Sequence, residues 1–222
     1  MEEKSVAFNF EARYYSIGTL DAKTRQVWIV LHGYGQMAQF FIKKFQSLAE
    51  QNIYVIAPEG LSRFYLSELT DQGRKDNKVG STWMTRENRE MDIRNYVTYL
   101  DTVFAKELNA FSHLPISLVG FSQGSATAVR WAIQGNVRFD KLILWAGIFP
   151  PDMDFNAGHN KLKDKKTYLV VGKEDPYLNE ARIKEFDELA LKIGNQPEKI
   201  FFEGRHEISE SVFPQLIEIN LS

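Results

Sequence analysis

The chain has 222 residues, no cysteine and a net charge of −2, with 25% of its residues charged. This length can bury one core, so residues 1–222 are predicted to form a single domain. The near-neutral charge gives no basic field to attract nucleic acid or an anionic membrane, and the lack of cysteine excludes disulfides, thiolate metal sites and acylated cysteine anchors. No apolar run approaches the about 20 residues of a membrane span, and the acidic start shows no signal-peptide pattern. We therefore expect a soluble, cytoplasmic protein without stable membrane anchoring.

Short apolar runs alternate with longer amphipathic ones, which is typical of βαβ units around a mostly parallel sheet with helices on both faces. The run 6–17 is predicted to be a strand or a hairpin arm, and the other predicted strands are 26–31, 53–57, 116–121, 141–145, 167–171 and 199–202. The runs predicted to be helices are 40–49, 88–108, 123–134, 180–193 and 208–219. Residues 61–86 and 149–163 are predicted to be long loops, and loops of that length are commonly functional.

A serine stands between two glycines where the apolar run 116–121 ends and a run of small residues begins. Gly120-Phe-Ser-Gln-Gly124 matches the Gly-x-Ser-x-Gly pattern, in which a sharp strand-to-helix turn exposes a strained, nucleophilic serine. Only residues without a bulky side chain fit two places before and after that serine. The pattern predicts Ser122 as a nucleophile, and its simpler interpretation is an ordinary helix N-cap.

A serine hydroxyl needs a base within hydrogen-bond distance, and the four candidates are His32, His113, His159 and His206. Hydrolases built on this bend have the chain order Ser, then Asp or Glu, then His, which leaves His159 and His206. His206 follows a predicted strand, at the edge where open α/β sheets bind ligands, whereas His159 stands in a segment rich in Gly and Asn; we favour His206. Asp175, just after another predicted strand, should orient His206, with its neighbour Glu174 as the rival.

The stretch Leu31-His-Gly-Tyr-Gly35 ends an early predicted strand, where this architecture needs a backbone N–H to bind an oxyanion. We expect two oxyanion donors, the N–H of Tyr34 and the N–H of Gln123. Glycines on both sides of Tyr34 let the backbone approach a substrate closely. In this interpretation His32 braces the turn and is not the base.

Four stretches together resemble the phospholipase/carboxylesterase family of α/β hydrolases, which includes acyl-protein thioesterases: Leu31-His-Gly-Tyr-Gly35, Gly120-Phe-Ser-Gln-Gly-Ser125, Gly172-Lys-Glu-Asp-Pro176 and Gly204-Arg-His-Glu-Ile208. The resemblance implies an α/β-hydrolase fold and a serine esterase that acts on carboxylic esters or thioesters. It also implies Ser122, Asp175 and His206 as a catalytic triad, with Tyr34 and Gln123 lending oxyanion N–H groups.

Two departures from that family bear on the substrate. The chain has Trp83-Met-Thr85 where relatives carry Trp-Phe-Asp, and Gln36 where they carry an aspartate after the glycine turn. The chain has no room for a separate cap domain, so we expect an open site for short or medium acyl chains. Trp83 and Phe149 are candidate substrate-binding residues, and the simpler interpretation of each is a plain packing residue.

No metal or cofactor is expected, and a small-molecule ester or thioester is the expected partner; the oligomeric state stays open. A second class of function is a non-catalytic binding protein or receptor, because one scaffold can serve many functions. A peptidase or lyase on the same scaffold is a further alternative.

Overall fold

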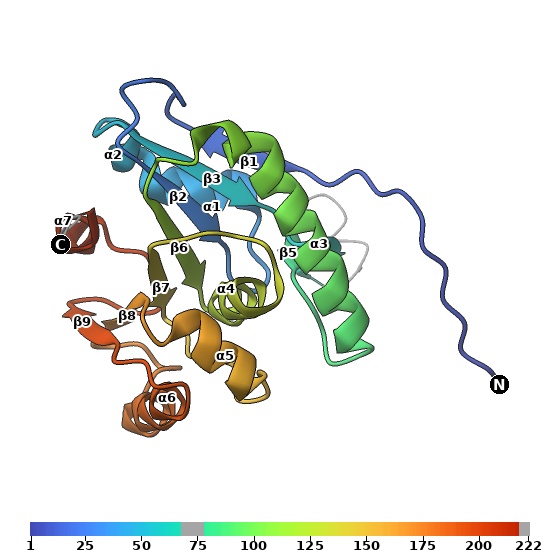
Figure 1. The fold of residues 1–222 in the computed structure, drawn as a ribbon. Helices are drawn as coiled ribbons and strands as arrows, with labels where there is room; N and C mark the ends of the chain where they lie inside the picture. Colours follow the sequence, from blue (N-terminus) through green and yellow to red (C-terminus); the bar gives the residue numbers. More distant parts are fainter. Residues whose placement is uncertain (68–77, 218–222) are drawn as a thin grey trace.

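The computed structural model describes residues 1–67 and 78–217, and its centre is one seven-stranded sheet (Figure 1). In chain order these strands are β1 (Tyr14–Ile17), β2 (Gln26–Leu31), β3 (Ile53–Pro58), β6 (Ile116–Phe121), β7 (Lys141–Trp145), β8 (Lys166–Gly172) and β9 (Glu198–Phe202). In space the order is β1-β3-β2-β6-β7-β8-β9. Strand β1 is antiparallel to β3 and the other neighbouring pairs are parallel, which confirms the mostly parallel sheet predicted from the alternating pattern.

Helices cover both faces of this sheet, as expected (Figure 1). The helices are α1 (Ala38–Phe41), α2 (Gln46–Ala49), α3 (Arg89–Leu108), α4 (Gln123–Gln134), α5 (Phe155–Leu162), α6 (Glu180–Lys192) and α7 (Phe213–Ile217). Helix α4 contacts both α3 and α5, so these three form one layer, and α7 lies on the opposite side of the sheet. Within the two described ranges, no helix is both long and apolar enough to cross a bilayer.

The central strands are buried along their whole length, as strands covered on both faces must be. Every residue of β2, β3, β6 and β7 is buried. On the α7 side, the Phe213 ring packs edge-on against Trp28 and Trp145, at centroid distances of 5.7 and 6.1 Å. The Lys141 ammonium donates to the Leu216 carbonyl at 2.7 Å, which satisfies a carbonyl at the end of that short helix.

The order of the strands in the sheet determines where a ligand site can form. The chain runs from β2 outward to β3, then crosses back so that β6 lies on the other side of β2. The loops that follow β2 and β6 therefore separate at the carboxyl edge of the sheet, and ligands bind at such a switch point in open α/β sheets.

Several predicted boundaries are wrong. The N-terminal strand comprises only Tyr14–Ile17 and not the predicted 6–17, because Tyr14 already pairs with Pro58, the last residue of β3, which leaves no residue of β3 for the earlier residues to pair with. The predicted helix 40–49 is split by a 3-10 turn at Ile42–Phe45. The predicted last helix begins as a 3-10 turn at Glu210–Val212 and continues as α7; its predicted residues 218–219 lie outside the described ranges.

Both predicted long loops contain regular structure. Within 61–86, β4 (Ser62–Tyr65) and β5 (Val79–Thr82) form an antiparallel pair, while 68–77 lie outside the described residues. Within 149–163, helix α5 begins after Asp154, whose side chain accepts a hydrogen bond from the Ala157 N–H. The polar sequence of both segments predicts loops. Regular structure forms there because tertiary packing overrides weak local propensity.

Candidate active site

Ser122 sits on a strained bend between β6 and α4. Its φ of 54° and ψ of −115° lie where a residue with a side chain is strained by roughly 1–3 kcal/mol. The two flanking glycines make the bend possible: a Cβ on Gly120 would overlap the Gly124 carbonyl, and a Cβ on Gly124 would overlap the Leu31 carbonyl. Ser122 holds the N-cap position of α4, yet its side chain forms no capping hydrogen bond with the described residues. The bend therefore does more than start a helix.

Asp175 and His206, predicted as acid and base, are hydrogen-bonded to each other. The His206 Nδ1 lies 2.8 Å from Asp175 Oδ2, and the other carboxylate oxygen accepts the Tyr177 N–H at 2.8 Å. The Asp175 side chain is completely buried, while that of His206 is 22% exposed. Glu174, the rival acid, is exposed to solvent. With Nδ1–H donating to the carboxylate, the Nε2 of a neutral His206 is left as a proton acceptor.

The His206 loop is held in place by close backbone contacts with β8. A Cβ on Gly172 would overlap the Arg205 carbonyl, and the Glu174 N–H donates to the Gly204 carbonyl at 2.9 Å. The ring of Phe121, just before Ser122, lies 4.9 Å from the His206 ring. The end of β6 and the loop after β9 are therefore in direct contact.

Ser122 and His206 line the same cavity, which has a volume of about 370 Å³. Phe149, predicted to contact the substrate, also lines it, together with Gln123 and Met84. The volume lies within the range of small-molecule sites.

The turn after β2 lies against Ser122. A Cβ on Gly33 would be 3.2 Å from the Ser122 Cβ, so the backbone around Tyr34 lies next to Ser122. Two hydrogen bonds hold this turn in place. The Gly35 N–H donates to the Ser81 carbonyl at 2.9 Å, and the Gly33 N–H donates to the Gln36 side chain at 2.9 Å. Gln123 opens α4, and the N–H groups of a helix's first turn have no intrahelical acceptor.

A profile of the phospholipase/carboxylesterase family of α/β hydrolases matches residues 13–219. The chain belongs to this family. It is therefore a hydrolase of the esterase and thioesterase type. No curated protein sequence matches the chain.

Solved structures with the same fold cover almost the whole chain. Acyl-protein thioesterase 2 from Zea mays is 15% identical and has a TM-score of 0.68, over 93% of this chain and 96% of that one. The phospholipase/carboxylesterase from Dyadobacter fermentans is 16% identical, with a TM-score of 0.63 over 96% and 99%. The Bacillus cereus carboxylesterase is 16% identical, with a TM-score of 0.63 over 94% and 92%. At these identities the likeness establishes the shared fold.

The other three histidines of this esterase-family protein lie in different surroundings. His32 is completely buried, and its burial lowers its pKa to about 4. Its Nε2 accepts the Gly60 N–H at 2.9 Å, and its Nδ1 lies 2.8 Å from the Gly33 carbonyl, so the neutral ring braces the turn. His113 is exposed and precedes β6, and His159 lies in α5 and not in the predicted loop.

Trp83, predicted to contact the substrate, is buried in the core next to His32. Its ring stacks on the His32 ring at 5.0 Å, and its Nε1 donates to the His32 carbonyl at 2.9 Å. These contacts make Trp83 a support of the turn after β2.

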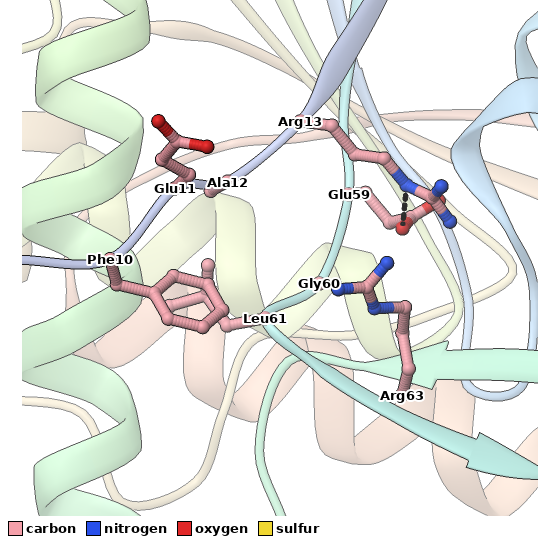
Figure 2. A pocket seen from close by; sticks show the side chains of 8 residues that line it. All are labelled: Phe10, Glu11, Ala12, Arg13, Glu59, Gly60, Leu61 and Arg63. Atoms are coloured by element: carbon pink, nitrogen blue, oxygen red, sulfur yellow. Dashed lines mark hydrogen bonds and ion pairs between the residues drawn. The ribbon is translucent and has the colours of Figure 1, made fainter.

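A second cavity, of about 230 Å³, lies between residues 10–13 and the end of β3 (Figure 2). There the Arg13 guanidinium donates to the buried Glu59 carboxylate at 2.7 Å, and that carboxylate also accepts the Ala38 N–H at 3.3 Å. Glu59 precedes Gly60, the residue that donates to His32. This ion pair therefore helps to fix the segment behind the turn after β2.

Sequence reasoning missed two groups of the Ser122 cavity. The Gln123 side chain accepts the Trp83 N–H at 3.2 Å and donates to the Met84 carbonyl at 3.0 Å, which ties the end of β5 to the start of α4. Arg130 and Arg182 line the cavity as well. The spacing of Gln123, Ala126 and Arg130 on α4 was the available signal, since residues three and seven places apart share a helix face.

Proposed function

We propose that this protein is a serine hydrolase that cleaves carboxylic esters or thioesters through an acyl-enzyme, with Ser122 as nucleophile, His206 as base and Asp175 as the orienting acid. The observation that carries the proposal is the convergence of these groups: a strained serine and a histidine line one cavity, and a buried carboxylate lies 2.8 Å from that histidine's other ring nitrogen. A helix cap and an unrelated surface histidine would have no reason to share this arrangement. The proposal keeps the small-molecule substrate and the cytoplasmic setting expected from the sequence.

In the first step, the Ser122 Oγ attacks the carbonyl carbon while the His206 Nε2 takes the hydroxyl proton. The Asp175 carboxylate stays ionised and stabilises the imidazolium that forms. The carbonyl oxygen becomes an oxyanion, which accepts hydrogen bonds from the N–H groups of Tyr34 and Gln123. One such donor is worth roughly 10² to 10³ in kcat.

In the second step, the tetrahedral intermediate collapses and its C–O or C–S bond breaks. His206 gives its proton to the departing alcohol or thiol, which leaves the acyl group on Ser122. Water then attacks the acyl carbon while His206 takes a proton from it. The second collapse releases the carboxylic acid as the Ser122 oxygen regains its proton from His206.

The wall of the cavity favours a compact acyl group. Phe149, Ile148 and Pro150 supply an apolar side, and a cavity of about 370 Å³ is small among ligand sites. We therefore propose short to medium acyl chains as substrates.

The experiment is a series of p-nitrophenyl esters of increasing acyl length, run beside an acyl thioester. We expect turnover to peak at short or medium length, and Ser122→Ala to lower kcat by roughly 10⁴ to 10⁶. The exposed Ser211 provides the matched control, because Ser211→Ala should leave kcat unchanged. Activity of Ser122→Ala within tenfold of the wild type would show that the nucleophile is assigned wrongly.

A further inference from the structure

The cavity that contains Ser122 is lined by two arginines, Arg130 from α4 and Arg182 from α6. Among the described residues that line it, none is acidic, and His206 is the other titratable group apart from the exposed Tyr177. An uncharged ester would offer neither guanidinium a counterion, so Arg130 would keep Asp152 as its partner and Arg182 would keep Glu185. The charged residues of this cavity wall therefore indicate which chemical groups the substrate carries.

Arg130 is on the helix that begins at the nucleophile. Gln123, Ala126 and Arg130 all line the cavity, as expected for one face of α4. Eight residues of helix separate the Cα positions of Ser122 and Arg130 by about 12 Å. Side chains on a helix lean toward its N-terminus, so the guanidinium is nearer to Ser122 than that separation.

The Arg130 guanidinium is buried beside one carboxylate, one thioether and the Tyr96 phenol. Its side chain is 8% exposed. One nitrogen donates to the Asp152 carboxylate at 2.9 Å, and another lies 3.5 Å from the Met84 sulfur. A guanidinium has five N–H donors, and a thioether is a weak acceptor. Among the described residues, Asp152 is the carboxylate that pairs with Arg130.

Asp152 does not neutralise this cluster, because a second guanidinium shares it. Arg89 from α3 also pairs with the Asp152 carboxylate. Glu90 lies 3.6 Å from the Arg89 Nε, but its side chain is 68% exposed and so largely screened by water. The Arg89 Nε is buried without a hydrogen-bond partner among the described residues, but Arg89 is not among the residues that line the cavity.

We propose that the substrate carries a second acidic group, a carboxylate or a phosphate, at the far end of its acyl chain, and that Arg130 binds this group while Arg182 attracts it at the other wall. The inference rests on the proposed function, since it uses Ser122 as the point of acyl transfer. Guanidinium groups bind both kinds of oxyanion through paired, charge-assisted hydrogen bonds. The helix spacing fits an acyl chain of about four to six carbons between the scissile carbonyl and the acid.

The test uses p-nitrophenyl esters of one six-carbon acid, capped at the far end by a carboxylate, a phosphate or a neutral amide. For the wild type we expect kcat/KM for an anionic cap to exceed that for the amide by at least tenfold, and the excess to shrink with added salt. The cap with the larger ratio identifies carboxylate or phosphate as the group recognised. A ratio of three or less for both anionic caps, with the amide ester still hydrolysed, would overturn the inference and leave the proposed function standing.

Variants test which arginine causes the preference for an anionic cap. Arg130→Gln should lower the ratio of anionic to amide kcat/KM at least tenfold, and Arg182→Gln should lower it by a smaller factor. Arg94→Gln, which removes the same charge from an exposed position of α3, should leave the ratio and the basal activity unchanged. An unchanged ratio in folded Arg130→Gln would refute the assignment. If that variant does not fold, Arg130→Lys decides in the same way, because an ammonium lacks the paired donors. Loss of Ser122-dependent hydrolysis of all three esters would instead count against the proposed function.

Discussion

His32 follows β2 and His206 follows β9, so both imidazoles lie at the carboxyl edge of one sheet. His32 is completely buried, its ring contacts two backbone groups and the Ser81 hydroxyl, and burial lowers its pKa to about 4. His206 is 22% exposed, faces a cavity and pairs with a carboxylate. The buried His32 ring accepts the Gly60 N–H and acts as a neutral brace, whereas the His206 ring pairs with a carboxylate and lines a cavity. Partner and exposure, and not position on the sheet, are therefore our grounds for proposing His206 and not His32 as the base.

The largest expected effect contrasts these two histidines directly. His206→Ala should lower kcat for a p-nitrophenyl ester by roughly 10⁴ to 10⁶, because the nucleophile loses its base. His32→Gln should lower thermal stability and cost less than about 10³ in kcat, since it can only disturb the oxyanion turn. Equal losses of kcat in the two variants, measured on folded protein, would contradict the division of roles.

A smaller loss is expected for the carboxylate partner. Asp175→Asn should lower kcat by about 10⁴, because an amide in that place favours the wrong tautomer of His206. Glu174→Gln is the matched control: it changes the neighbouring, exposed acid and should leave kcat unchanged. Steady-state kinetics on both variants checks the choice between the two acids, and a greater loss in Glu174→Gln would reverse it.

The smallest of these effects is a pH dependence of stability that comes from His32. Its pKa is about 4 in the folded protein and 6.5 as the ordinary value, so the unfolded chain binds more protons between these pH values. The free energy of unfolding should therefore rise with pH across that window, by about 3 kcal/mol for this group.

Urea unfolding from pH 4 to pH 7 measures that contribution. His32→Gln should flatten the rise, whereas His113→Gln, at an exposed histidine, should not change it. If His32→Gln leaves the rise of the unfolding free energy with pH unchanged, burial does not lower the pKa of His32.

The centre of the fold could be predicted from the sequence because local signals agree there. The apolar run 116–121 and the helix 123–134 have the predicted boundaries in the structure, since an all-buried strand and a glycine-flanked serine leave little choice. Helix α5 could not be predicted, because its asparagines and glycine are weak helix formers. It forms through packing: a Cβ on Gly158 would already lie 3.1 Å from the Ile193 side chain.

In the N-terminal segment, the sequence pattern predicts more strand than the structure contains. Val6, Phe8 and Phe10 alternate as in a strand, yet β1 begins only at Tyr14, and the preceding residues run away from the sheet (Figure 1). Alternation predicts a strand only where a neighbouring strand is long enough to pair with it. For the site, a short motif predicted Ser122 as the nucleophile, whereas Arg130 could be distinguished from a solvated arginine only once the face of α4 toward the cavity was known.

The central claim is that Ser122 is a nucleophile activated by His206, and labelling with a fluorophosphonate followed by mass spectrometry of the peptides tests it most directly. We predict one adduct per chain, on Ser122, formed fast in the wild type and lost in His206→Ala. A folded protein that takes up no label, or that takes it up at a different serine, would contradict the account.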